Sequence, residues 1–431
     1  MLSIIGLVTI LLIVALLLHG KLIPVIPLVL IPIVAAFATG FNFAEIGEFF
    51  NEGISGVINV VIMFIFAILY FGIMQNAGLF DPLIRKMIQL TQGNVIAISM
   101  GTVIIAAVAQ LDGSGASTFL ITIPALLPLY QRMKMNPYLL LLLIGGSASI
   151  MNMLPWAGPL GRAASVLEMD VTELWRPLIP IQIIGMVLML VLALIIGIFE
   201  KKRIERKHGV ISAQIEELTT VETENKPTSN KLLWFNFILT ILVIGVLVWG
   251  VIPAGFAFMI GVSIALPVNF RTMEEQNNSL RAHAPNALTM GAIILAAGSF
   301  LGILTGTGML DSIAADTVTI IPHVIEPYIH LIIGFFGLPF DLLLSTDAYY
   351  FALLPVVEQI GSTFGISSLA TAYAMIIGNI VGTFVSPFSP ALWLALGLAK
   401  LEMGKHIKYS FFWLWGVSIA LLVIAFFIGL V

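Results

Sequence analysis

A polar stretch, LDGSGAST at 111–118, interrupts an otherwise apolar part of this chain. Glycines loosen helical hydrogen bonding, and hydroxyl and carboxylate groups need partners that hydrocarbon lacks, so the stretch predicts a cavity enclosed by protein. Helix ends at such a break direct N–H groups at anions, while free carbonyl and hydroxyl oxygens bind cations. We therefore expect a binding site for a substrate or an ion. Its candidate residues are Asp112, Gly113, Ser114, Gly115, Ser117 and Thr118.

Three further interruptions extend this candidate site. LSTDAYYF at 344–351 has the same character as the first stretch, and proline breaks follow one element later in each half of the chain, at 149–159 and 381–391. Corresponding interruptions in two halves are typical of a secondary transporter's binding site. Proline kinks whose hydroxyls bond to their own helices would explain any one of them alone. The added candidates are Asn152, Pro155, Ser345, Thr346, Thr383, Ser386, Pro387 and Ser389.

Two acidic residues, Asp112 and Asp347, lie within these apolar surroundings, one in each half. A carboxylate at membrane depth is costly unless it meets a cation, a proton or a hydrogen-bond network. We expect both residues to bind a co-transported proton or to complete the coordination shell of a metal; a structural role at the tip of a turn is the alternative. Asp341 is a weaker candidate, because its position fits a helix end.

Two basic residues also lie near the interruptions. Arg162, about two turns after the first proline break, could present its planar guanidinium to a substrate carboxylate. Extension of its side chain to the membrane surface is the competing interpretation. His330 could relay protons, but a packed histidine with no such role fits it better.

The composition indicates which class of protein and which kind of element hold these residues. Of 431 residues, 59% are hydrophobic and 10% are charged, which indicates an integral membrane protein. Apolar runs of helical length recur throughout, so we predict an all-α polytopic membrane protein with about 11–12 transmembrane helices, in a bacterial cytoplasmic membrane. The first run reads as a span and not as a removed signal peptide. The absence of cysteine excludes thiolate metal sites, and the net charge of −4 does not indicate a nucleic-acid partner.

A shorter apolar segment lies between the fourth and the fifth expected span of each half. The segments at 116–130 and 348–360 are too short to cross, and Arg132 and Lys134 after the first one are typical of the cytoplasmic side. We therefore expect a re-entrant hairpin within each segment. The spans are predicted at 3–18, 23–40, 57–76, 94–110, 137–153 and 177–199, and at 232–250, 252–269, 286–306, 324–340, 366–384 and 409–430.

The chain divides into two similar halves, 1–199 and 232–431, separated by a charged segment at 200–231 that is predicted to be a cytoplasmic linker. FGIMQNAGLFD from Phe71 aligns with LGILTGTGMLD from Leu301. We therefore predict two repeats of one structural unit, either inverted or parallel in the membrane. Six spans and a hairpin in each half do not give the odd number that inversion requires. The aligned pairs, each 230 positions apart, are Gly72 with Gly302, Gly78 with Gly308 and Asp81 with Asp311.

Common catalytic and nucleotide-binding patterns are missing from the sequence. It contains no Walker A motif, Rossmann fingerprint, HExxH or G-x-S-x-G. We therefore expect no enzyme activity, no use of ATP by this chain and no permanent cofactor.

Four long motifs resemble the citrate–metal–proton symporters, the CitMHS family of the ion transporter superfamily. They are QLDGSGASTFLITIPALLPLYQRM, MNMLPWAGPLGRAAS, STDAYYFALLP and SPFSPALWLALGLAKLEMGKHI. The resemblance implies import of citrate complexed with Mg²⁺, Ca²⁺ or Fe³⁺, driven by protons, so that the metal is cargo. Free citrate carries about three negative charges near neutral pH. Chelation removes much of that charge before the anion enters a site of low dielectric.

More distantly, the chain is similar to dicarboxylate transporters of the same superfamily. That similarity implies a scaffold domain and a transport domain with two opposed hairpins and two broken helices, in a homodimer that works by an elevator motion. Neither hairpin tip has the Ser-Asn-Thr sequence of those relatives. This difference argues against sodium coupling. The alternative function is a sodium- or proton-coupled carrier of free di- or tricarboxylates, or an ion antiporter of the same superfamily.

Overall fold

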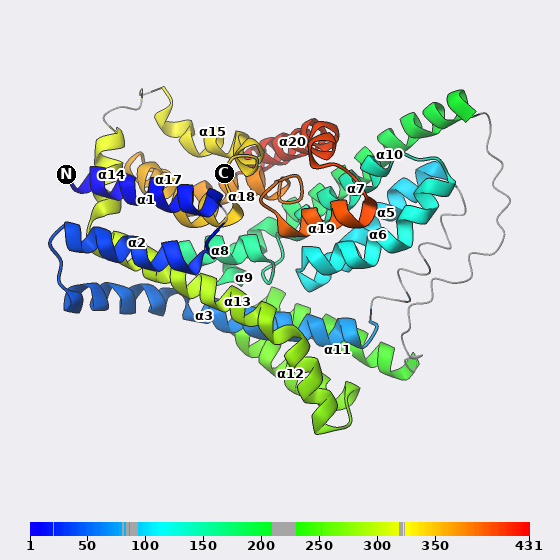
Figure 1. Cartoon of the computed structure of the whole chain (residues 1–431), viewed down its shortest axis with the longest axis horizontal. Coiled ribbons are helices and arrows are strands. Elements are labelled where there is room, and N and C mark those ends of the chain that lie inside the picture. The colour runs from blue at the N-terminus through cyan, green and yellow to red at the C-terminus, as the bar shows by residue number, and fades with distance from the viewer. Residues whose placement is uncertain are drawn as a thin grey trace.

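The computed structural model describes the chain apart from residues 20, 80–81, 83–85, 87–93, 209–229, 251, 319–321 and 323. All regular elements of the described residues are helices, as the composition predicts (Figure 1). The first half contains α1 (Leu2–His19), α2 (Val25–Ala38), α3 (Phe43–Asn76), α5 (Val95–Ala109), η1 (Gln110–Asp112), α6 (Gly115–Arg132), α7 (Pro137–Met151), α8 (Gly158–Val166), α9 (Val171–Trp175), η2 (Arg176–Leu178) and α10 (Ile179–His208).

The second half begins at α11. Its elements are α11 (Asn230–Trp249), α12 (Ala254–Asn269), α13 (Met273–Gly306), α14 (Met309–Val318), η3 (Glu326–Tyr328), α15 (Ile329–Phe335), α16 (Gly337–Asp341), the π-helix η4 (Ala348–Leu353), α17 (Leu354–Thr363), α18 (Ser368–Ile380), α19 (Pro390–Ala399) and α20 (Met403–Phe427).

Six helical stretches of the described chain are long and apolar enough to cross a membrane: Phe43–Asn76, Val95–Asp112, Val171–Arg206, Asn230–Trp249, Met273–Gly306 and Met403–Phe427. Six shorter apolar helices accompany them. The chain is therefore a multi-pass membrane protein, as expected.

The two longest helices, α3 and α13, extend well beyond the spans predicted at 57–76 and 286–306. Both have 34 residues, and both begin at a capping box. In the first, Asn42 accepts from the N–H of Glu45 while Glu45 accepts from the N–H of Asn42; Thr272 and Glu275 do the same 230 positions later. Capping boxes satisfy N–H groups that a helix leaves unpaired, so polar first turns extend these apolar helices.

The prediction that a hairpin lies within 116–130 is wrong in its bounds. Residues 115–132 form one continuous helix, α6, which lies beside α5 (Figure 1). The chain turns at η1 and at Gly113, whose φ of +73° is a left-handed conformation that suits glycine. Hairpin 1 therefore comprises 95–132, and the span expected at 94–110 is its first arm.

The second expected hairpin differs in the same way. Residues 348–363 form one continuous arm, η4 with α17, and the opposite arm is α15 with α16. Hairpin 2 therefore comprises 329–363, with its turn at 342–347, and it takes up most of the span expected at 324–340.

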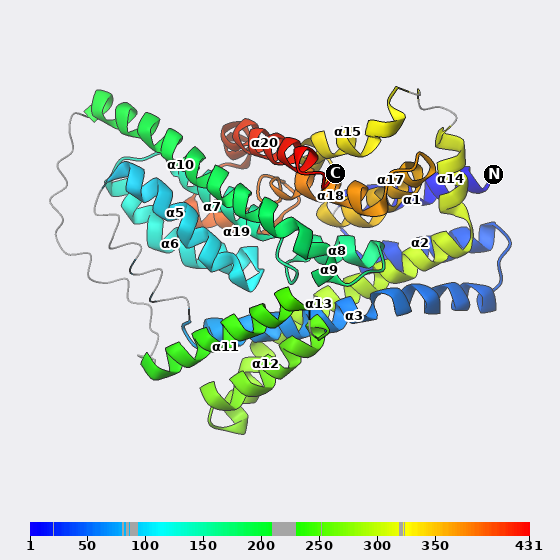
Figure 2. The ribbon, with the colours of Figure 1, turned by 180° about the vertical axis from the view of Figure 1, so that it is seen from behind.

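Two of the remaining helices are interrupted where the sequence predicts proline breaks. The first break, 152–157, separates α7 from α8, and the second break, 381–389, separates α18 from α19. The broken helices and both hairpins lie on one side of the molecule together with α10 and α20 (Figures 1 and 2). The other side is a long-helix layer of α2, α3, α11, α12 and α13.

Glycines let α3 and α13 cross at very close range within the long-helix layer. A Cβ on Gly53 would lie 2.1 Å from the carbonyl oxygen of Gly298, and one on Gly302 would lie 2.3 Å from that of Phe49. Such contacts are typical of helix pairs in membranes, where small residues permit close backbone packing.

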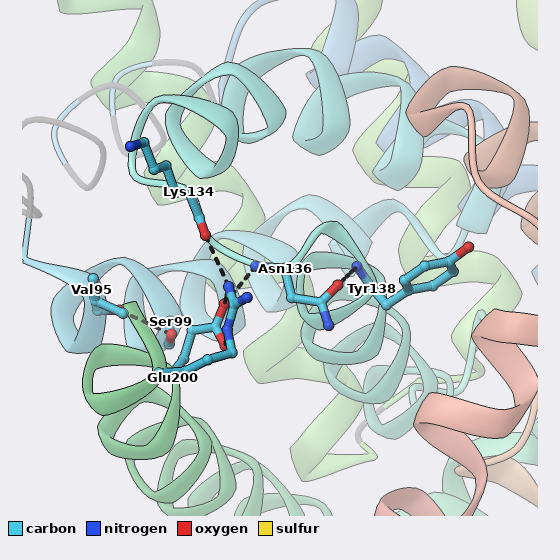
Figure 3. A network of polar contacts seen from close by, with 7 residues as sticks. Val95, Ser99, Lys134, Asn136, Tyr138 and Glu200 are labelled. Atoms are coloured by element: carbon cyan, nitrogen blue, oxygen red, sulfur yellow. Dashed lines mark hydrogen bonds and ion pairs between the residues drawn. The ribbon is translucent and has the colours of Figure 1, made fainter. Parts of the chain in front are cut away.

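The linker expected at 200–231 begins as helix, since α10 continues to His208; residues 209–229 lie outside the described part. Figure 3 shows how α10 is fixed near its end. Glu200 accepts from the N–H of Asn136 at 2.5 Å and from Arg203, which also donates to the carbonyl oxygen of Lys134 at 2.9 Å. Asn136 in turn caps α7 through the N–H of Tyr138. The loop between hairpin 1 and α7 is thereby held against α10.

Candidate functional site

A cavity of about 340 Å³ lies where the long-helix layer meets the tip of hairpin 1. This volume falls in the range of about 300–1,000 Å³ that is typical of small-molecule sites. Its walls come from α3, α13, hairpin 1 and the first break. The lining residues are Phe64, Ile68, Gly72, Gln75, Asp112, Gly113, Ser114, Ala116, Ser117, Trp156, Gly158, His283, Asn286, Thr289, Met290 and Ile293.

The tip of hairpin 1 is closed by Asp112. One carboxylate oxygen accepts from the N–H of Ser114 at 2.8 Å, and the other accepts from the hydroxyl of Ser117 at 2.5 Å. Ser114 also caps α6 by accepting from the N–H of Ser117. The first N–H groups of a helix have no partner within it. Because Ser114, Ala116 and Ser117 line the cavity, the start of α6 offers such donors to an anion there.

A buried hydrogen-bond chain joins hairpin 1 to the first break. Gln110 Nε2 donates to Asn152 Oδ1 at 2.8 Å, and the hydroxyl of Thr118 donates to Gln110 Oε1 at 2.6 Å. Trp156 Nε1 donates to the carbonyl oxygen of Leu111 at 2.7 Å. Asn152 and Thr118, both predicted site residues, therefore hold the tip in place behind the cavity wall.

Aromatic packing joins hairpin 1 to the second break as well. A Cβ on Gly115 would lie 2.4 Å from the ring of Phe384, and the rings of Phe119 and Phe384 meet edge to face with centroids 5.2 Å apart. Phe384 is also held by His406 Nε2, which lies 3.1 Å from its carbonyl oxygen. Hairpin 1 is thus in contact with both breaks.

Hairpin 2 meets α8 through an ion pair. Arg162 Nε donates to Asp347 Oδ1 at 2.6 Å, and the two side chains are 11% and 16% exposed. The guanidinium carbon also lies 6.0 Å from the centroid of the Phe351 ring. A side chain held in this way does not extend to the membrane surface, so that interpretation of Arg162 is wrong.

Arg162 also lies close to the cavity. A Cβ on Gly158, which lines the cavity, would be 2.5 Å from Arg162 Nη1. The part of the chain that the structure describes provides a hydrogen-bond partner for Nε but none for the two Nη groups. The guanidinium therefore lies directly behind the cavity wall with donors available.

The predicted residues of the second half hold the backbone of hairpin 2 and the second break. Ser345 Oγ accepts from the N–H of Ala348 at 3.2 Å. Ser386 Oγ donates to the carbonyl oxygen of Asp341 at 2.5 Å, and Thr383 Oγ1 donates to that of Ile380 at 2.7 Å. Pro387, Ser389, Thr346 and Pro155 lie at the turns and breaks without lining the cavity.

Of the predicted site residues, the cavity thus brings together Asp112, Gly113, Ser114 and Ser117. Its opposite wall, with Gln75, His283, Asn286 and Thr289, was not predicted. The expected span at 286–306 excluded His283, whereas α13 includes it. The one signal in the sequence for this wall was the glycine at position 72, which leaves room for the His283 ring. A Cβ on Gly72 would lie 2.4 Å from that ring, and the ring nitrogen Nε2 lies 3.0 Å from Asn76 Nδ2.

The described residues contain no group of three or more His, Cys, Asp or Glu side chains that could hold a metal ion. Asp112 and Asp347 have the partners given above, and their expected role in metal coordination stays a prediction.

The sequence matches the family of proteins described as citrate transporters, CitMHS, over residues 1–378. Three proteins of Bacillus subtilis (strain 168) are similar over the whole chain. One named Mg(2+)/citrate complex secondary transporter is 38% identical, covering 100% of this chain and 99% of its own. One named citrate transporter is 36% identical and fully covered in both chains. An uncharacterized transporter, YraO, is 33% identical, with 100% and 99% covered.

The fold is similar to that in the crystal structure of the YdaH transporter of Alcanivorax borkumensis, whose topology is described as unusual. The TM-score is 0.58 over 90% of this chain and 89% of that one, with 16% sequence identity. At this identity the likeness concerns the fold alone.

Proposed function

The chain belongs to the citrate transporter family CitMHS, and from this premise we propose that it imports citrate as a complex with a divalent metal, in symport with protons. The observation that carries the proposal is the cavity at the tip of hairpin 1. The name of the relative that is 38% identical, a transporter of the Mg²⁺/citrate complex, supports the form of the substrate. Transport of free di- or tricarboxylates is the second candidate.

The charge of the cavity favours the complex over the free anion. Its lining contains one carboxylate, Asp112, one histidine, His283, and neither lysine nor arginine. Citrate with three ionised carboxyl groups would enter such a site at a high desolvation cost. A bound divalent ion leaves roughly one negative charge on the complex, which hydroxyl groups, the start of α6 and a single guanidinium can stabilise.

Each part of the site then has a distinct role. Ser114, Ser117 and the first N–H groups of α6 hydrogen-bond to the carboxylates of the complex. Arg162 supplies charge through its guanidinium, whose Nη1 lies beside Gly158. Citrate itself provides most oxygen ligands of the metal, and Mg²⁺ accepts carboxylate and hydroxyl oxygens readily. The protein therefore needs no dedicated metal site.

The arrangement of elements supports two inverted repeats. With the hairpin arms grouped together and the short α9, η2, α14 and η3 set aside, the described part of each half has five other helical units: α1, α2, α3, α7 with α8, and α10, then α11, α12, α13, α18 with α19, and α20. Five is odd, as inversion requires, and this count supports inverted over parallel repeats. Capping boxes 230 positions apart support the same pairing of α3 with α13.

We further propose that the long-helix layer is the scaffold and that the hairpins and broken helices move against it as the transport domain. The cavity lies between these two parts, where such a motion would carry a bound substrate. The homodimer and the location in the bacterial cytoplasmic membrane are part of the same proposal.

A single introduced cysteine tests the site, because the chain has none of its own. Thr289 lines the cavity opposite hairpin 1, and Lys405, with a side chain that is 64% exposed, lies elsewhere. Labelling of Thr289→Cys by a thiol reagent should be slowed by citrate with Mg²⁺ and not by citrate with EDTA, while labelling of Lys405→Cys is unaffected. Equal protection by citrate in EDTA would favour the carrier of free carboxylates.

A further inference from the structure

Asp341 is a buried carboxyl group that the proposed substrate site does not use. It ends α16, the first arm of hairpin 2, and is 1% exposed. Its Oδ2 has no hydrogen-bond partner within the described chain. A Cβ on Gly382 would lie 2.3 Å from this oxygen, so the carboxyl group faces the backbone of the second break.

The surroundings of Asp341 are polar, and the described residues provide it with no salt-bridge partner. Asn379 faces the carboxyl group and donates to the carbonyl oxygen of Gly337 at 3.2 Å. Tyr349 and Tyr350 of η4 interact electrostatically with Asp341. The hydroxyl of Tyr349 donates to the carbonyl oxygen of Met375, while that of Tyr350 is buried without a partner in the described chain.

The helices packed against α16 are α15, α18 and α20, and none supplies a charge that pairs with Asp341 in the structure. Lys405 pairs with Glu402, and His406 lies against the carbonyl oxygen of Phe384. The guanidinium of Arg162, which interacts electrostatically with Tyr350, is paired with Asp347. The other titratable groups on these three helices are His330, Tyr373, Lys408 and Tyr409.

This setting favours the neutral form of the carboxyl group. An ionised carboxylate in a buried site without a cation or sufficient donors is strongly disfavoured, so the group binds a proton. Asp112 differs because it accepts two hydrogen bonds at the tip of hairpin 1, and Asp347 differs because it has a guanidinium partner. Of the three acids, Asp341 alone has a buried carboxylate oxygen without a partner in the described structure.

Asp341 contacts two parts of the chain with irregular backbone. Its carbonyl oxygen accepts from Ser386 in the second break, and η4 beside it is a π-helix. π-helical turns occur frequently at functional sites. A shift of hairpin 2 against the second break would open the carboxyl group to water.

We propose that Asp341 carries the co-transported proton. The carboxylate takes up one proton from the outer solution when the site is open to it, holds the proton while enclosed, and releases the same proton to the cytoplasm. The carboxylate is regenerated at the end of the cycle, and no other reactant is needed. The inference rests on the proposed proton-coupled import, and it places the coupling in hairpin 2, apart from the cavity at hairpin 1.

Asp341→Asn tests the inference, since asparagine resembles the protonated acid in shape and cannot ionise. Proteoliposomes would be assayed for exchange of labelled Mg²⁺-citrate without gradients, for accumulation driven by a pH gradient, and for substrate-induced proton entry with a trapped pH dye. We expect the variant to exchange substrate, while accumulation relative to exchange falls by about tenfold or more and proton entry is lost. Asp311→Asn, which alters an exposed acid, should behave as wild type.

Accumulation and proton entry at wild-type levels in Asp341→Asn would overturn the inference. Should that variant be inactive in every assay, Asp341→Glu decides: coupled uptake with a displaced pH profile supports the role, and an unchanged profile contradicts it. Failure of the proposed proton coupling and failure of the role of Asp341 give different results. Wild-type uptake that ignores the pH gradient, or follows a sodium gradient, defeats the proposed proton coupling itself; proton-driven uptake by both wild type and Asp341→Asn defeats only the role of Asp341.

Discussion

Arg162 and Asp347 lie 185 positions apart in the chain, and Arg162 Nε donates to Asp347 Oδ1 at 2.6 Å. The pair joins α8, which follows the first break, to the tip of hairpin 2. In hairpin 1, Gln110 donates a hydrogen bond to Asn152 in the first break. The segments that carry the proposed site are therefore connected across the two halves of the chain.

Truncation of one partner of the ion pair should destabilise the protein more than truncation of both. Arg162→Ala or Asp347→Ala leaves a largely buried charge without its counterion, and we expect a loss of about 3 kcal/mol for either change. The double variant should recover part of that loss. Thermal unfolding of the purified protein in detergent measures all three, and a double variant whose loss equals the sum of the single losses would show that the pair does not contribute.

Arg162→Lys should weaken substrate binding while keeping the positive charge. Lysine lacks the planar fork whose Nη1 lies beside Gly158, so a charge-assisted hydrogen bond to the citrate complex is lost. We expect KM for Mg²⁺-citrate to rise by about tenfold. Initial uptake rates over a range of substrate concentrations provide the measurement, and an unchanged KM would remove Arg162 from the site.

Gly115→Ala should disturb the contact between hairpin 1 and the second break. The added Cβ would lie 2.4 Å from the Phe384 ring, and such overpacking costs about 1–3 kcal/mol. We expect reduced transport and a lower unfolding temperature, both partly restored by Phe384→Leu in the same chain. Gly397→Ala is the matched control, because a Cβ on Gly397 meets nothing within 4 Å. Equal behaviour of the two alanine variants would contradict the close contact.

Gln110→Ala should loosen the tip of hairpin 1. It leaves the buried side chains of Asn152 and Thr118 without their partner, at a cost of about 1–3 kcal/mol. A looser tip should expose Ser117, so the cysteine of Ser117→Cys should react faster with a thiol reagent in the Gln110→Ala background. An unchanged reaction rate would show that Gln110 does not hold the tip.

The sequence was informative about element types and about where helices break. LDGSGAST and LSTDAYYF both lie at hairpin tips, and the proline breaks at 152–157 and 381–389 interrupt helices as predicted. These features are local: glycine, proline and hydroxyl residues act on the backbone within a few positions. The family resemblance was confirmed by the match over residues 1–378 and by the two relatives named as citrate or Mg(2+)/citrate transporters.

The pairing of elements was not predictable in the same way. The stretch Val95–Asp112 is apolar enough to cross a membrane, and composition did not reveal that it pairs with α6 as the first arm of hairpin 1. The partner of Arg162 lies in the other half, and His283 belongs to the part of α13 that the expected span at 286–306 left out. These relationships depend on tertiary packing between segments far apart in the chain.

Uptake of radiolabelled citrate into proteoliposomes, measured over a series of divalent metals, with EDTA, and at several pH gradients, tests the central claim most directly. We predict that uptake requires a divalent metal that citrate chelates, is abolished by EDTA, and rises with an inward-directed proton gradient. Equal uptake of citrate or succinate in EDTA and with added metal would contradict it.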